Sequence, residues 1–128
     1  MKQKTGGAAA LILLLSLTII LLTGCGNNSA FDGSKTANET GFQMEYTILN
    51  KEQTCDLTLP EGEQLRVEFA HKSGSVDISV GQEGKEPIYT GTSQTDGGFT
   101  LVIPESGVYH ISVTGHRAKG SIGFTRIP

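Results

Sequence analysis

The chain has 128 residues, with 13 acidic side chains against 10 basic ones and a formal charge of −3. This length suits a single small domain with one core. An acidic chain without a run of Lys or Arg lacks the phosphate-neutralising surface of nucleic-acid-binding proteins, and it has no polybasic segment for anionic lipid headgroups. We therefore expect no nucleic-acid partner.

The first 24 residues have the three parts of a secretory signal peptide. Lys2 and Lys4 give a positive start, residues 8–22 are almost entirely apolar, and two small residues precede Cys25. The apolar stretch is shorter than the ~20 residues that a membrane-spanning helix needs. The sequence thus predicts export, with cleavage close to Cys25.

Leu22-Thr23-Gly24-Cys25 resembles the lipobox of bacterial lipoproteins, which reads Leu, a small or β-branched residue, Gly or Ala, and Cys. The resemblance implies cleavage before Cys25, a diacylglyceryl thioether on its sulfur and acylation of the new N-terminus. A thiolate is the nucleophile for such a step, and two or more fatty chains give durable attachment. We expect a lipid anchor on the extracytoplasmic face of a cell membrane, and Gly26 permits export to the outer membrane of a two-membrane cell. The alternatives are an uncleaved anchor or a free thiol after ordinary secretory cleavage.

A polar stretch follows the expected lipidation site. Residues 25–40 are rich in Asn, Ser, Gly and Thr without an apolar period, which predicts a flexible tether with a reach on the order of 20 Å. The expected organisation is a signal peptide over residues 1–24, a lipidated tether over 25–40 and a folded domain over 41–128.

From residue 41 onward, apolar and polar residues alternate in short runs separated by Gly, Pro, Asp and Ser, which is typical of strands joined by turns. No stretch shows a helical period. The sequence predicts an all-β fold, a small two-layer antiparallel β-sandwich of jelly-roll-like form with about eight strands. The expected strands cover residues 42–48, 55–59, 65–70, 76–80, 88–90, 99–103, 109–113 and 121–127.

The two halves of this domain have similar sequences. LTLPE at residues 57–61 matches LVIPE at 101–105, and GSV at 74–76 matches GSI at 120–122. Each half therefore reads strand, Pro-Glu turn, strand, Gly-Ser turn and strand, because Pro and Gly favour turns. Two such units facing each other form a sandwich, and either duplication or shared turn chemistry accounts for the likeness.

The C-terminal ~75 residues also resemble bacterial pre-peptidase C-terminal domains, small jelly-roll-like sandwiches appended to secreted peptidases. SGSVDISV at residues 73–80 and GVYHISV at 107–113 carry the resemblance. It implies a sandwich fold. This chain differs from such proteins because it carries no peptidase, so the resemblance implies no activity.

Residues 115–121 hold the densest group of basic side chains, bracketed by two glycines. Exposed backbone amides and cations together can bind an anion, and loops on a rigid scaffold are common recognition sites. We expect a loop here, joined by residues of the other half. The candidate ligand or partner loop comprises His71, Lys72, His116, Arg117 and Lys119; the alternative is that these cations only offset an acidic surface.

The three histidines, His71, His110 and His116, suggest a zinc site completed by Asp56 or Asp77. None of them stands at an i, i+2 or i, i+4 spacing from another, so we interpret them as solvated side chains. We expect no metal ion and no cofactor.

Cys55 alternates with Leu57 and Leu59, which predicts a buried core thiol. The chain lacks a nucleophile elbow, a phosphate loop and a zinc-binding His-Glu-x-x-His helix, so we expect no enzyme. Two hypotheses follow: a non-catalytic module that contacts another envelope protein through loops or a strand edge, and a module that binds cell-wall glycan. The absence of Trp disfavours the second hypothesis, since glycan-binding surfaces commonly present flat aromatic rings.

Overall fold

The computed structural model describes residues 30–128, so the predicted signal peptide, Cys25 and the first part of the tether lie outside the described residues. None of the described residues belongs to a helix with the length and apolar character needed to cross a membrane. The described chain forms seven strands: β1 (Phe31–Asn38), β2 (Gly41–Leu49), β3 (Glu52–Leu59), β4 (Gln64–Gly81), β5 (Tyr89–Gln94), β6 (Gly97–Val102) and β7 (Gly107–Ile127).

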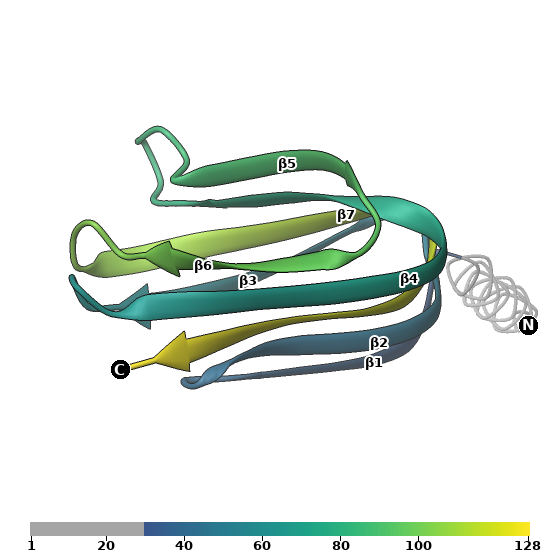
Figure 1. The fold of residues 1–128 in the computed structure, drawn as a ribbon, viewed down its shortest axis with the longest axis horizontal. Coiled ribbons are helices and arrows are strands. Elements are labelled where there is room, and N and C mark those ends of the chain that lie inside the picture. The colour runs from purple at the N-terminus through teal and green to yellow at the C-terminus, as the bar shows by residue number, and fades with distance from the viewer. Residues whose placement is uncertain (1–29) are drawn as a thin grey trace, which may run out of the picture. The chain divides into compact units, whose positions relative to one another are not determined.

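All strand pairs are antiparallel, and the two long strands β4 and β7 pair with each other along most of their length. Both strands bend midway and so pass from one layer into the other (Figure 1). Within each of these two strands, the residues before the bend and the residues after it therefore pair with different neighbouring strands. The first layer has the order β1-β2-β7-β4-β6 and contains residues 120–127 of β7 and 64–71 of β4. The second layer has the order β3-β7-β4-β5 and contains residues 110–116 of β7 and 75–81 of β4.

The bends coincide with irregularities in the β4–β7 pairing, where the register shifts between His71 and Ser75. Gly74 has a φ of +72° and Arg117 a φ of +53°. Such bulges add a residue to one strand and bend it. We call the segments 50–51, 71–75, 95–96 and 115–120 the bend end, and the connections 39–40, 60–63, 82–88 and 103–106 the turn end, because every strand runs between these two ends.

The core lies between the two layers and takes the inward residues of both. Its largest fully buried side chains include Tyr109, Phe42, Phe124, Leu65 and Ile111. Within residues 30–128 no polar or charged side chain is fully buried. The Tyr109 hydroxyl donates a 2.6 Å hydrogen bond to the Glu105 carbonyl, a device that β-sandwiches use to fix a connection to the following strand.

The prediction of an all-β, two-layer antiparallel sandwich is confirmed. Each strand predicted over residues 42–127 coincides with observed strand, but the pairs 65–70 with 76–80 and 109–113 with 121–127 are continuous within β4 and β7. The Gly-Ser segments at 74–75 and 120–121 were predicted as turns. Both lie within the strands instead: Gly74 falls at a bulge of β4, whereas Gly120 and Ser121 pair regularly with His71 and Ala70.

The prediction of a flexible tether is wrong for residues 31–38. This segment forms the edge strand β1, which pairs with β2 from Phe31↔Leu49 to Asn38↔Gly41. Its side chains are exposed except for the half-buried Phe31, which packs against the core. An edge strand is held by backbone hydrogen bonds, and here only Phe31 contributes to the core. The rest of the strand therefore needs no apolar alternation.

The matching halves occupy equivalent places. In each, a short strand (β3 or β6) leads through a Pro-containing turn into a long bent strand (β4 or β7) in the other layer, and each short strand pairs with the long strand of the other half. The two turns also bond to each other, because Ile103 donates to the Glu63 carbonyl and accepts from Gly62.

Candidate functional site

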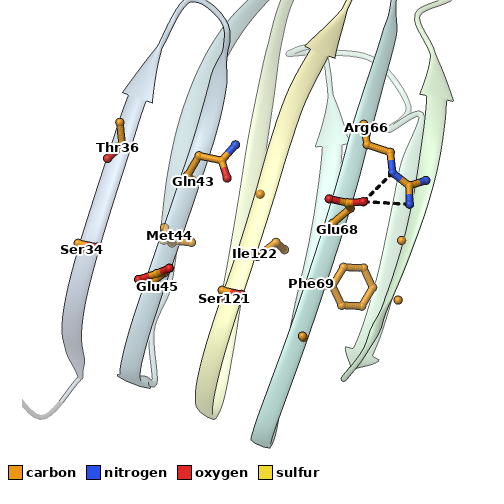
Figure 2. A pocket seen from close by; sticks show the side chains of 14 residues that line it. Ser34, Thr36, Gln43, Met44, Glu45, Arg66, Glu68, Phe69, Ser121 and Ile122 are labelled. Carbon is orange, nitrogen blue, oxygen red and sulfur yellow. Dashed lines mark hydrogen bonds and ion pairs between the residues drawn. The ribbon is translucent and has the colours of Figure 1, made fainter.

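The outer face of the first layer is hollowed into a groove (Figure 2). It has a volume of about 530 Å³ and crosses all five strands of this layer. The residues that line it from solvent-facing positions are Ser34 and Thr36 of β1, Gln43 and Glu45 of β2, Ser121 and Gly123 of β7, Arg66, Glu68 and Ala70 of β4, and Gly98 of β6; Gly97, opposite Phe69, also lines it.

Glycine on two strands gives the groove its depth. Glu68 stands between Gly123 and Gly98, its paired residues on β7 and β6. A Cβ atom at Gly123 would overlap the amide of Gln43, and one at Gly98 would lie 2.7 Å from Arg66 Nη2. The long polar side chains of Gln43 and Arg66 therefore lie down over the glycines and form part of the floor.

The polar side chains of the groove hold each other in place. Arg66 donates from Nε to Glu68 Oε2 at 3.3 Å, and its Nη2 lies 3.2 Å from the same oxygen, as Figure 2 shows. Gln43 Nε2 donates to Thr125 Oγ1 at 3.2 Å. The Glu68 side chain keeps 68% of its surface exposed, so its second carboxylate oxygen can accept further hydrogen bonds from a ligand.

A second hollow, of about 540 Å³, continues the groove toward the bend end. Ser34, Glu45 and Ser121 line both hollows. Beyond these three residues, the second hollow is lined by Lys72 of β4 and Lys119 of β7, together with Gly33, Tyr46, Thr47 and Gly120. The two hollows form one trough, from the Arg66–Glu68 pair to two lysines.

His71, predicted as part of a recognition loop, instead closes the core at the bend end. Its Nδ1 lies 2.7 Å from the Thr95 carbonyl oxygen, which can only accept, so this nitrogen carries the hydrogen. Tyr46 Oη lies 2.6 Å from Nε2, within hydrogen-bonding distance, and the two rings stack. Burial raises the pKa of the Tyr46 hydroxyl well above its ordinary value.

His116 lies on the outer side of the second layer. Its Nε2 is 2.8 Å from Asp77 Oδ2, and Asp77 Oδ1 accepts the backbone N–H of Ser93 at 2.9 Å. The hydrogen bond from His116, helped by that of Ser93, lowers the pKa of Asp77. The Arg117 backbone N–H donates to Asn50 Oδ1 at 2.9 Å, and the residue is exposed.

The predicted recognition residues therefore separate into three positions. Lys72 and Lys119 line the trough, Arg117 lies exposed at the bend, and the two histidines turn to other faces. None of the five lies in a loop, since all belong to β4 or β7. The two halves of the domain meet at this point, because Ser73 of β4 pairs with Lys119 of β7.

Among residues 30–128, no group of three or more His, Cys, Asp or Glu side chains is arranged to hold a metal ion. His110 pairs only with Asp56, at 2.7 Å from Nδ1. In the same part of the chain, neither His110 nor His116 has a Ser or Cys hydrogen-bonded to its ring. These pairs therefore provide a base but no adjacent nucleophile.

Cys55 is half-buried on the edge strand β3, where it packs against the core as a partly buried residue. The prediction of a buried core thiol is thus correct in that Cys55 packs against the core, but the residue is only partly buried. Burial, together with the Asp56 carboxylate, raises the pKa of the thiol, opposed by Lys35. A raised pKa keeps the sulfur protonated and unreactive near neutral pH.

Sequence reasoning missed the trough, although the sequence carries a signal for it. In Ser121-Ile122-Gly123-Phe124 the inward residues are large and the outward ones small, and on β6 the outward residue beside Glu68 is Gly98. An outward strand face without bulky side chains leaves a hollow wherever neighbouring strands share it.

No family model matches the chain, and no curated protein matches it. Among solved structures, the chain is similar to PliG of Aeromonas hydrophila, a periplasmic lysozyme inhibitor of g-type lysozyme, at 19% identity and a TM-score of 0.48, with 73% of this chain and 92% of that chain covered. It is also similar to a CBM4 structure, at 12% identity and a TM-score of 0.43, covering 78% and 79%. A third is the carbohydrate-binding module CBM6cm-2 of Cellvibrio mixtus lichenase 5A in complex with cellotriose, at 13% identity and a TM-score of 0.42, covering 78% and 88%. These likenesses concern the fold alone.

Proposed function

We propose that the protein is a lipid-anchored, non-catalytic binding module on the extracytoplasmic face of a bacterial membrane, with the trough as its binding face. The lipobox-like residues before Cys25 support the anchor. The described domain contributes a preformed polar surface and no nucleophile–base pair.

The trough suits an extended, hydroxyl-rich polymer, for which cell-wall glycan is the candidate. Sugar hydroxyls both donate and accept hydrogen bonds, and the trough alternates acceptors (Glu45, Glu68) with the mixed amide of Gln43. The ring of Tyr46 reaches the trough only at its basic end and is almost fully covered. Affinity would therefore rest on hydrogen bonds more than on stacking, which gives modest values.

The observation that carries this proposal is the continuity of the two hollows through Ser34, Glu45 and Ser121. The second hollow lengthens the first, so the trough offers room for more than one saccharide-sized subsite. Small-molecule sites are commonly concave and preformed in this way.

The test is calorimetric titration of the full chain, in mild detergent, with cell-wall glycan fragments selected on a glycan array. Glu68→Ala should raise the dissociation constant about tenfold, because hydrogen bonds to charged groups contribute about 1.5–3 kcal/mol. Glu86→Ala removes an equally exposed carboxylate at the turn end and should leave binding unchanged. Equal effects of the two substitutions, or no glycan bound at all, would reject the trough as a glycan site.

The other candidate partner is an envelope protein that adds a strand to β1. Only β2 pairs with β1, so its second edge is free within the described residues. Free edges can accept an extended peptide through backbone hydrogen bonds. Cross-linking from β1 should then capture an envelope protein, and added glycan should not reduce this capture. That result would favour a protein partner.

A further inference from the structure

Four cations gather at the bend end although they are scattered in the sequence. Lys72 and Lys119 border the same hollow. Lys51 and Arg117 join them through the backbone, because Gly115 donates to the Lys51 carbonyl at 3.0 Å and the Arg117 N–H donates to Asn50, the neighbour of Lys51. All four side chains are exposed, and within residues 30–128 none forms an ion pair.

Three carboxylates around the bend end are engaged in hydrogen bonds, and Glu45, which lines the same hollow as Lys72 and Lys119, takes part in no ion pair among residues 30–128. Asp96 Oδ1 accepts the His71 N–H at 2.9 Å, and Asp77 bonds to His116 and Ser93. Asp32 Oδ2 accepts the Thr47 hydroxyl at 3.1 Å. The cations therefore remain available to an external anion.

The turn end has the opposite charge. Its connections carry six carboxylates, Glu39, Glu61, Glu63, Glu83, Glu86 and Glu105, against the single cation Lys85. A domain with cations at one end and carboxylates at the other acquires a preferred orientation near a charged surface.

The anchor enters the domain at the cationic end. Phe31 pairs with Leu49, which pairs with Ala118 within the bend of β7, and Figure 1 shows β1 starting where β4 and β7 curve between the layers. Cys25 precedes Phe31 by six positions, so the chain between them spans at most about 20 Å when fully extended. A strand of eight residues such as β1 is about 26 Å long, so this segment is too short for the turn end to face the membrane.

We infer that the bend end is a docking surface for anionic lipid headgroups, and that Lys51, Lys72, Arg117 and Lys119 hold the domain upright on the membrane that carries its anchor. This inference rests on the proposed lipidation of Cys25. Basic side chains near an anionic leaflet each favour contact about fivefold. The acidic turn end and the Arg66–Glu68 end of the trough are then held away from the headgroups.

The test uses the full chain, processed in a bacterial host and placed in bicelles of phosphatidylcholine that contain a headgroup-spin-labelled lipid, with or without phosphatidylglycerol. When phosphatidylglycerol is present, the spin-labelled headgroups should broaden the NMR amide signals of residues 71–75 and 115–120 at the bend end. The signals of residues 60–63 and 82–86 at the turn end should stay sharp. Added salt should reverse the effect, because it screens exposed charges. Mass spectrometry of the same sample reports the modification of Cys25.

Lys51→Gln/Arg117→Gln should reduce the contact of the bend end with the headgroups about 25-fold and so clearly weaken the broadening, although Lys72 and Lys119 retain part of it. Neither residue lines the trough. The control Lys35→Gln/Lys85→Gln removes the same net charge elsewhere and should leave the broadening intact. Three results would overturn the inference: broadening that does not depend on phosphatidylglycerol, broadening that also affects the turn end, or broadening that is undiminished in the bend-end variant. A lipidated Cys25 would in each case leave the proposed anchor standing. An unmodified Cys25 would overturn both.

Discussion

At the scale of single residues, one ion pair ties the end of the last strand to the rest of the domain. Arg126 donates from Nε and Nη2 to the two Glu63 carboxylate oxygens, at 2.9 Å each, and from Nη1 to the Glu39 carbonyl at 3.0 Å. The pair therefore joins β7 to the β3–β4 and β1–β2 turns. Such a bidentate geometry is stronger and more specific than a single contact.

The pair makes stability depend on pH. The hydrogen bonds from Arg126 lower the pKa of Glu63 below its ordinary value of 4.5. A carboxyl group whose pKa is lower in the folded protein stabilises the fold above its unfolded pKa, and this contribution disappears as the pH falls through the folded value. Glu63→Gln should therefore be less stable than wild type at neutral pH, and the difference should close on acidification below about pH 4.5.

The measurement is urea unfolding of both proteins from neutral to strongly acidic pH. Glu61→Gln, which changes an exposed carboxylate in the same turn, serves as the control and should show only a small, weakly pH-dependent difference. A Glu63→Gln difference that stayed constant down to the lowest pH would show that the pair acts through packing and not through charge.

At the scale of elements, the two bends depend on each other because β4 and β7 touch there. Gly74 has a positive φ, and a Cβ atom at this position would overlap the Arg117 carbonyl oxygen and lie 2.6 Å from that of His116. Gly62 also has a positive φ, of +90°, but a Cβ there would meet nothing within 4 Å. A substitution at Gly62 thus tests backbone strain alone, whereas one at Gly74 tests the same strain together with the close contact between β4 and β7.

Gly62→Ala should cost about 1 kcal/mol, because alanine is strained at positive φ. Gly74→Ala should cost about 2–4 kcal/mol, because the overlap with β7 adds to the same strain. Both free energies of unfolding come from urea titrations of the full chain. Similar losses at the two positions would mean that the bend can open without disturbing β7.

Alternation of apolar residues predicted most strands because the sandwich buries one face of each. Phe42, Met44 and Tyr46 all point inward as their spacing requires. β1 escaped prediction because only Phe31, at its start, packs against the core, so nothing selects apolar residues in the rest of the strand. The bends escaped it because glycine at positive φ serves turns and bulges alike, and only the partner strand decides between them.

At the scale of the whole molecule, the candidate site depends on pairs that no local pattern contains. Lys72 and Lys119 come together because β4 and β7 bend at the same level, and Ser34 joins them because β1 completes the layer. The sequence identified the lysines as unusual residues. It could not predict the trough, since β1 was expected to be a tether and the bend a loop.

The shared long strands also predict how the molecule unfolds. Leu65 lies in the first layer and Ile111 in the second, both fully buried, and β4 and β7 run through both layers. Leu65→Ala and Ile111→Ala should each cost about 2–5 kcal/mol, whereas Val102→Ala, at a position 62% exposed, should change stability by no more than about 0.5 kcal/mol.

Because neither layer can lose β4 or β7 alone, each core substitution should destabilise both layers equally. Amide hydrogen exchange, followed against urea for residues 43–46 of the first layer and 54–57 of the second, measures the two layers separately. Their transitions should coincide in wild type and shift together in both variants, as two-state unfolding requires. If Leu65→Ala loosened only the first layer, the bends would be hinges between two independently stable sheets. The trough, which is lined by β1, β2, β7, β4 and β6 of the first layer, could then change shape while the second layer stayed intact.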